Sequence, residues 1–169
     1  MDSTIVVATA IILAIAILIA LLRLSMKIKH ENQQKRILNA VSEFEKANNL
    51  HIDLADMFRQ KFIGFDDQRR YLVFVENGDI VPKVQKIDLL EVKKADIGVH
   101  SSKTGKTSLL TSLDEHSAAF NLILTLVTRE EINLSFYNEV QDGLGEREHL
   151  LAHAKKWAGL INTANKTAI

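Results

Sequence analysis

The chain contains no cysteine, one proline and seven glycines among its 169 residues. Without cysteine it can form no disulfide framework, thiolate zinc site, iron–sulfur cluster or thiol nucleophile. One proline and scattered glycines exclude collagen-like and low-complexity character. An excess of charge of one sign is also missing, because 21 Lys and Arg residues balance 21 Asp and Glu residues. A dedicated nucleic-acid binder carries a basic excess, so we do not expect a nucleic-acid partner.

Charge is locally absent from Thr4 to Leu22, a run that reads TIVVATAIILAIAILIALL. As a helix this run would be about 28–30 Å long, which matches the hydrocarbon core of a bilayer. A cleaved signal peptide has a basic start and a small-residue cleavage site. This chain instead begins Met-Asp-Ser-Thr, and the run ends in Leu-Leu-Arg-Leu. We therefore predict an uncleaved transmembrane anchor over residues 1–24.

The charges that flank this run predict its orientation. Five cations follow it and are opposed only by Glu31; they are Arg23, Lys27, Lys29, Lys35 and Arg36. Lys and Arg next to a span are retained on the cytoplasmic side. We predict a single-pass protein of the cell (inner) membrane, with its N-terminus outside and its C-terminal domain cytoplasmic. The same five cations are predicted membrane-surface residues, each contributing about 1 kcal/mol near anionic headgroups.

Residues 25–50 are predicted to form a juxtamembrane stalk. The polar stretch 27–47 lacks Gly and Pro, places Ile37, Leu38, Val41 and Phe44 on one side at helical spacing, and ends at Asn48-Asn49. This apolar stripe is short, whereas a coiled coil needs three or four sustained heptads. We favour a stalk helix that docks on its own domain over a coiled-coil dimer.

Residues 51–169 are predicted to form one β-rich domain with a C-terminal helix. Six apolar runs with strand character are separated by polar turns; they are Lys61–Phe65, Arg70–Glu76, Ile80–Ile87, Val92–Val99, Phe120–Val127 and Ile132–Tyr137. Asn77-Gly78 is a strong signal for a tight hairpin turn. The Ser/Thr/Lys-rich segment 101–118 is expected to be a long, mobile loop.

The period returns to that of a helix from Glu146 to Ala164, where Leu150, Ala154, Trp157 and Ile161 form one stripe. A helix with this stripe can cover the open apolar face of a bent sheet. The predicted fold class is α+β: a transmembrane helix and stalk helix, then an antiparallel β meander or split barrel capped by the C-terminal helix.

This order of elements resembles the pleckstrin-homology-like (PH-like) superfold, and more specifically single-pass bacterial membrane proteins with such a cytoplasmic domain. The segments that carry the likeness are KFIGFDDQRRYLVFVENGD, VQKIDLLEVKKADIGV, INLSFYNE and HAKKWAGLIN, within residues 60–164. Lipid-binding members hold inositol phosphates with cations around the first hairpin. Here that region has Lys61, Arg69 and Arg70, while Asp66-Asp67 at its tip would repel phosphates. The resemblance therefore implies binding of proteins or peptides.

Residues 101–107, SSKTGKT, suggest a phosphate-binding loop but do not satisfy its pattern. That loop needs G-x-x-x-x-G-K-[ST], and the position of its first glycine is occupied by His100. We interpret Gly-Lys-Thr as an exposed loop tip.

His149 and His153 lie four residues apart on the predicted last helix, with Glu146 one turn earlier. This spacing can place two imidazoles on one metal ion. The metalloprotease pattern H-E-x-x-H is absent, because Leu150 follows His149, and no neighbouring third ligand is evident. We therefore predict no metal and no cofactor, with a metal-dependent enzyme kept as a third hypothesis.

Other chemical groupings also have ordinary explanations. Asp114, Glu115, His116 and Ser117 are consecutive, so they cannot easily form a catalytic triad. The carboxylate pairs Asp66-Asp67 and Glu130-Glu131 fall at predicted turns, where charge favours solvent.

The sequence thus predicts a non-enzymatic, membrane-tethered interaction domain for an unknown protein or peptide partner at the cytoplasmic face. The alternative is an anionic-lipid surface binder that uses the juxtamembrane cations together with Lys61, Arg69 and Arg70.

Overall fold

The computed structural model describes residues 2–66, 68, 70–78, 81–101, 107–109 and 117–167. Within these ranges it does not describe the side chains of residues 2–16, 20, 22, 26–30, 100, 101, 107–109, 117, 118, 166 and 167. The fold is α+β, with antiparallel sheets and a C-terminal helix, as the sequence predicts.

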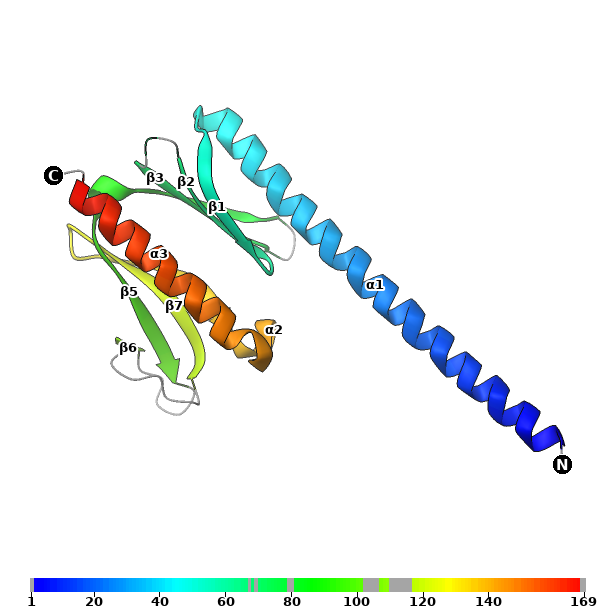
Figure 1. The fold of residues 1–169 in the computed structure, drawn as a ribbon. Coiled ribbons are helices and arrows are strands. Elements are labelled where there is room, and N and C mark those ends of the chain that lie inside the picture. Colours follow the sequence, from blue (N-terminus) through cyan, green and yellow to red (C-terminus); the bar gives the residue numbers. More distant parts are fainter. Residues whose placement is uncertain are drawn as a thin grey trace.

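The first element, α1, is one helix of 47 residues, Asp2–Asn48. The stalk is therefore continuous with the preceding apolar run, and its N-terminal half extends away from the rest of the chain (Figure 1). Asn49 ends the helix with a positive φ of 51°, and the Asn48 side-chain amide donates to the Phe44 carbonyl at 3.0 Å. The predicted end at Asn48-Asn49 is confirmed.

The predicted anchor, residues 1–24, lies mostly outside the residues whose side chains are described. A search of the described residues finds no helix with the length and apolar character of a membrane span.

Two four-stranded antiparallel sheets follow α1. The first has the order β1-β2-β3-β4, with bounds Ile52–Phe58, Lys61–Asp66, Tyr71–Glu76 and Lys83–Asp88. The second has the order β6-β5-β7-β8, with bounds Thr107–Leu109, Val92–Ser101, Ser117–Leu126 and Glu131–Asn138. A 3₁₀ turn, η1, connects the sheets at Leu89–Glu91. After β8 come α2 (Glu139–Asp142), η2 (Leu144–Glu146) and α3 (Arg147–Thr167).

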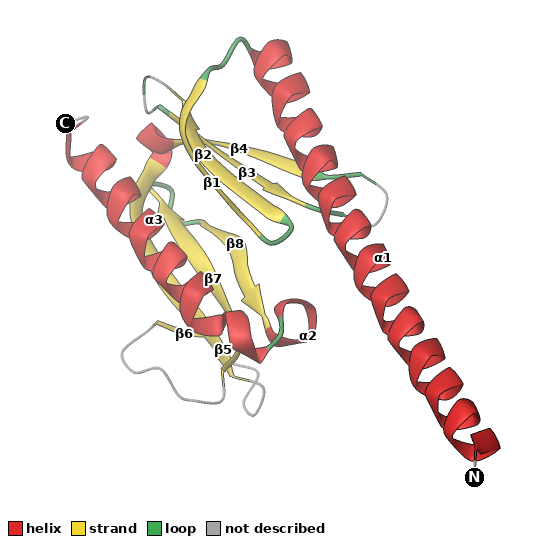
Figure 2. Ribbon diagram, turned by 45° about the vertical axis from the view of Figure 1, so that its right-hand side comes forward, coloured by secondary structure: helices red, strands yellow, loops and turns green. Residues whose placement is uncertain are grey.

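The main core lies between the two sheets and α3, which runs along one side of them (Figure 2). The predicted stripe of α3 is fully buried there: Leu150, Ala154, Trp157 and Ile161. In the β7–β8 pair, Leu122 is opposite Leu134 and Leu124 is opposite Ile132. The predicted runs Phe120–Val127 and Ile132–Tyr137 are therefore strands, and they pair with each other.

A second, smaller core lies on the opposite face of the first sheet, where α1 packs. Ile37 and Val41 of α1 are buried against Phe62, Val73 and Val75 of β2 and β3. The sheet is thus covered on both faces, which explains why β2 and the centre of β3 are buried without alternation. The predicted docking of the stalk on its own domain is confirmed.

Several expectations about the β-rich part are wrong. The described residues contain eight strands where six were predicted, since β1 and β6 were not predicted. β1 reads IDLADMF and has no clean apolar alternation, so its pairing with β2 supplies what its own sequence does not.

The Asn77-Gly78 hairpin joins β3 to β4, but not through a two-residue turn. Glu76 pairs with Lys83, so the connection includes residues 77–82. Pro82 comes before β4 instead of within it.

Another error concerns Asp66, which is buried at the end of β2 and accepts a 2.7 Å hydrogen bond from the Tyr71 backbone N–H. Its carboxylate closes the β2–β3 turn. The prediction that Asp66 lies in solvent is therefore wrong.

Candidate binding pocket

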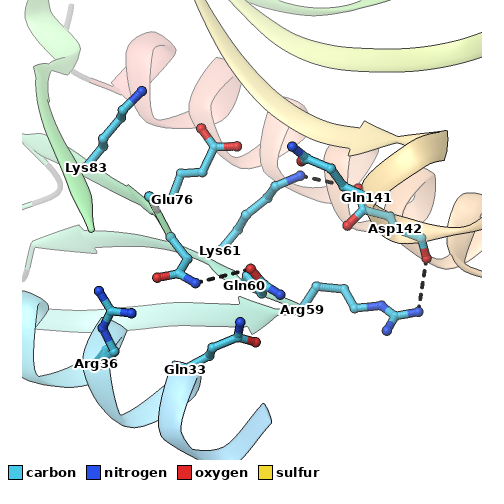
Figure 3. Close-up of a pocket in the computed structure, with 11 residues that line it drawn as sticks. Gln33, Arg36, Arg59, Gln60, Lys61, Glu76, Lys83, Gln141 and Asp142 are labelled. Atoms are coloured by element: carbon cyan, nitrogen blue, oxygen red, sulfur yellow. Dashed lines mark hydrogen bonds and ion pairs between the residues drawn. The ribbon is translucent and has the colours of Figure 1, made fainter. Parts of the chain in front are cut away.

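A pocket of about 700 Å³ lies where α1, the first sheet and α2 meet (Figure 3). Its lining combines side-chain amides, cations and carboxylates, which are Gln33, Arg36, Arg59, Gln60, Lys61, Glu76, Asn77, Gly78, Lys83, Gln141 and Asp142. α1 supplies the first two, the β1–β2 turn and β2 the next three, and the β3–β4 hairpin the next four. The pocket therefore joins the stalk to the body.

A buried ion pair forms the inner wall of the pocket. Lys61 Nζ lies 3.4 Å from Asp142 Oδ2, and the two side chains are only 3% and 7% exposed. Lys61 Nζ also donates to the Phe136 carbonyl at 3.3 Å. Asp142 Oδ2 accepts a second hydrogen bond, at 2.8 Å, from the Asn138 backbone N–H. Buried charges persist only when they are paired and hydrogen-bonded in this way.

The turn that presents Asp142 follows from local sequence. Asn138 caps α2, because its Oδ1 accepts from the Val140 backbone N–H at 3.0 Å. Gly143 ends α2 with a φ of 77°, a conformation that suits glycine. This one-turn helix therefore holds Asp142 beside the start of β2, where Lys61 lies.

Arg59 connects the first sheet to α2 and η2. It follows β1 with a positive φ of 53°, so the tight β1–β2 turn directs its side chain outward. Its Nη2 donates to the Asp142 carbonyl at 3.1 Å and lies 2.9 Å from Glu146 Oε1. These contacts join the β1–β2 turn to α2 and η2 at the edge of the pocket.

The β3–β4 connection forms the opposite wall. The Asn77 backbone N–H donates to the Gln60 carbonyl at 2.9 Å, and the Asn77 amide donates to Gln60 Oε1 at 3.2 Å. A Cβ on Gly78 would lie 2.4 Å from the Val81 carbonyl oxygen, a clash that requires glycine. The shape of this wall therefore depends on the backbone contact of Asn77 and on the absence of a side chain at Gly78.

The lining carries four cations and two carboxylates. Lys61 is paired with Asp142, and Arg59 is paired with Glu146 of η2, while the lining as a whole has two more cations than carboxylates. The net positive character and the amides suit an acidic, hydrogen-bonding ligand such as a carboxylate-rich segment.

The five predicted membrane-surface cations are spread along α1, of which Arg23, Lys35 and Arg36 are exposed. The side chains of Lys27 and Lys29 lie outside the described residues. Arg36 lines the pocket, so the structure gives it a second environment that its position in a basic run does not reveal.

Of the predicted first-hairpin cations, the two that the structure describes, Lys61 and Arg70, lie at opposite ends of the β2–β3 pair. Lys61 is buried in its ion pair, whereas Arg70 is half exposed and lies 3.4 Å from Asp88. Arg69 lies outside the described residues.

Of the loop 101–107, only the backbone positions of Ser101 and Thr107 are described, at the ends of β5 and β6. Asp114, Glu115 and His116 lie outside the described residues, and Ser117 begins β7. Glu130 and Glu131 are exposed, as predicted.

A second polar cluster joins β1 to α3. Asp56 Oδ2 accepts hydrogen bonds from Lys156 Nζ at 2.6 Å and from Trp157 Nε1 at 2.8 Å. His153 Nδ1 lies 3.6 Å from the same oxygen. Desolvation by burial acts to raise the pKa of Asp56, but the hydrogen bonds from Lys156 and Trp157, with the positive charge nearby, lower it below its ordinary value. Asp56 therefore holds the buried indole in place.

The sequence pattern did not identify Asp142, Arg59 or Asp56 as site residues. The available signal was Lys61, a lone cation in the apolar run of β2, because a buried cation needs a buried acid as its partner. Glu139 and Asp142 are the two acids between the end of β8 and Gly143.

Comparisons of the chain with protein-family models, with curated proteins and with solved structures find no match.

Proposed function

We propose that this chain is a single-pass membrane protein that presents a PH-like, non-enzymatic binding domain at the cytoplasmic face. Its ligand is an acidic segment of a protein partner, which binds in the polar pocket between α1 and the body. The single observation that carries the proposal is this cation- and amide-lined pocket of about 700 Å³, built on a buried ion pair.

The membrane part of the proposal is supported by the uncharged run Thr4–Leu22 and the cations after it. The PH-like assignment is supported by the order of elements: four strands in one sheet, a second antiparallel sheet, and a closing helix whose Trp157 is buried. The non-enzymatic assignment is supported by the inner wall of the pocket, where Lys61 and Asp142 are engaged in a buried structural ion pair.

The distance along α1 favours a protein ligand over a lipid headgroup. Because α1 is one helix, Gln33 lies nine residues beyond Leu24, or about 14 Å along the axis, and Arg36 lies about 18 Å along it. The headgroup layer of one leaflet is only about 5–8 Å thick. Arg23, Lys27 and Lys29 are therefore within reach of headgroups, whereas the pocket lies beyond them.

The test uses the full-length protein in nanodiscs of neutral lipid, exposed to peptides of equal length that are acidic, neutral or basic. We expect the acidic peptides to bind, and Lys83→Glu to weaken that binding because Lys83 lines the pocket. Lys93→Glu is the matched control, since Lys93 is also exposed and is on β5. Equal binding of all three peptide classes, or equal loss with both variants, would contradict the proposal.

The lipid-binding alternative is measured in the same system. Replacing neutral with anionic lipid should increase association of residues 25–169 with the bilayer if the juxtamembrane cations bind headgroups, and added salt should reverse it. Carbonate extraction and a reporter fused to the C-terminus test the anchor and its orientation. Release of the full-length protein by carbonate, or an extracellular reporter signal, would contradict the membrane assignment.

A further inference from the structure

The second polar cluster contains two imidazoles in an unusual mutual position. His149 and His153, one turn apart on α3, place their Nε2 atoms 3.3 Å from each other, with ring centroids 4.6 Å apart. His149 is 63% exposed and His153 is 24% exposed, so the pair is open to solvent.

Each imidazole has a carboxylate on its other side. Asp56 Oδ2 lies 3.6 Å from His153 Nδ1, and Glu146 Oε2 lies 3.9 Å from His149 Nδ1. At these distances neither carboxylate makes a hydrogen bond to its ring, so each acts on the ring through its negative charge. The contact between the two Nε2 atoms is a hydrogen bond in which one ring donates and the other accepts. The same 3.3 Å approach lets both nitrogens bind one cation once that proton is lost.

We propose that His149 and His153 bind one late first-row divalent cation, of the Zn²⁺, Ni²⁺ or Cu²⁺ class, through their Nε2 atoms. Two nitrogens bound at about 2.0–2.1 Å to a tetrahedral metal ion are about 3.3–3.4 Å apart, which matches the observed separation. Asp56 and Glu146 act as positioning residues that orient the rings, an outer-shell role that carboxylates have in many histidine–metal sites.

The remaining charges near the pair specify the kind of metal. Lys156 lies 2.6 Å from Asp56, and Arg59 lies 2.9 Å from Glu146, so both carboxylates are already neutralised. A hard cation such as Mg²⁺ needs oxygen ligands, whereas neutral imidazoles suit Zn²⁺, Ni²⁺ and Cu²⁺. Within the described ranges no group of three or more His, Asp or Glu side chains converges on one point. The proposed site therefore has two protein ligands and leaves its other positions to water.

This inference does not depend on the proposed function, because the pair lies on α3 and takes no part in the pocket lining. It is tested with full-length protein in nanodiscs, stripped with a chelator and dialysed against Zn²⁺, Ni²⁺, Cu²⁺ or Mg²⁺ chloride. We expect one bound ion per chain with the first three metals and none with Mg²⁺. Electron paramagnetic resonance of the Cu²⁺ form should show two nitrogen ligands.

His149→Ala is the main variant, because His149 is exposed and its loss should leave the fold intact. We expect it to weaken metal binding by at least the roughly 10–100-fold that loss of an outer-shell partner costs, and Glu146→Gln to weaken it by about 10-fold. His51→Ala, which removes an exposed imidazole at the start of β1, is the matched control and should bind like wild type. Equal metal uptake by wild type and His149→Ala would overturn the site. A proton shared between the two Nε2 atoms in nitrogen NMR spectra, unchanged by added Zn²⁺, would overturn it as well.

Discussion

Lys61 and Asp142 are 81 residues apart in the sequence, yet their charged atoms lie 3.4 Å apart with both side chains almost completely buried. The pair joins β2 to α2 and forms the inner wall of the candidate pocket. Because its two charges stabilise each other out of water, its response to mutation differs from that of a surface ion pair.

Removing one member of this pair should be strongly destabilising. Lys61→Met leaves the Asp142 charge buried without its partner, and we expect a loss of about 3–5 kcal/mol in the free energy of unfolding. The double variant Lys61→Met/Asp142→Asn should lose less than the sum of the single variants. Urea unfolding followed by fluorescence of the single, buried Trp157 measures both. Lys93→Met, at an exposed position, should stay within about 0.5 kcal/mol of wild type.

Asp56 should make the fold sensitive to acid. Its pKa is lowered in the folded chain, so its contribution is fully present above the unfolded value near 3.9 and is lost as the pH falls through the lower folded value. Asp56→Asn should therefore be less stable than wild type at neutral pH, and this difference should shrink below about pH 4. Asp53→Asn, at an exposed position of the same strand, should show no such change. A constant difference from neutral to acid pH would contradict the assigned role of Asp56.

Tyr137 should make the stability of the fold fall at alkaline pH. Its ring is fully buried and its hydroxyl has no hydrogen-bond partner among the described residues. Burial raises the pKa of this hydroxyl, and the nearby Glu139 adds to the effect. The associated stability is present below the unfolded pKa of about 10 and is lost as the pH rises above it, because only the unfolded chain ionises readily.

Tyr137→Phe should consequently stay within about 1 kcal/mol of wild type at pH 7, since it removes a hydroxyl that is buried without a partner. Above about pH 10 it should be more stable than wild type. Tyr71→Phe is the control, because it leaves Tyr137 and its alkaline loss in place. The measurement is the melting temperature of each protein from pH 7 to above pH 10. Parallel curves of melting temperature against pH for wild type and Tyr137→Phe would contradict this role of the Tyr137 hydroxyl.

Two glycine substitutions should have opposite effects. Gly78→Ala places a Cβ 2.4 Å from the Val81 carbonyl oxygen, and we expect it to cost about 1–3 kcal/mol. Gly159 lies within α3, and nothing is within 4 Å of the Cβ that alanine would add. Gly159→Ala should therefore stabilise the chain by up to about 1 kcal/mol, through helix propensity. Melting temperatures of the two variants that shift in the same direction would be inconsistent with this geometry.

Local periodicity was enough to predict the regular elements that carry their own apolar pattern. The stripe around Trp157 predicted the buried face of α3, and the apolar runs that contain Leu122 and Leu134 predicted β7 and β8. The end of α1 was predicted from the Asn48-Asn49 pair. By contrast, β1 has a mixed pattern and owes its strand conformation to pairing with β2, which no local pattern reports.

The candidate sites depended much less on local pattern. The spacing of His149 and His153 was visible in the sequence, but the carboxylate of Asp56 behind them comes from a strand almost one hundred residues earlier. Asp66 was expected at a solvated turn, and Lys61 was a cation of the lipid-binding alternative. Both are buried because α1, α2 and the second sheet close around the first sheet.

The sequence by itself determined which segments of this protein are helix or strand wherever a repeating apolar face exists, because that face depends only on residues a few positions apart. It also determined the balance of charge and the position of the long uncharged run. Only the tertiary structure decided which faces meet, which charges lose water and which distant side chains share a pocket. The physical reason is that burial and Coulomb interactions depend on distance in space, and folding brings together residues that the order of the chain keeps far apart.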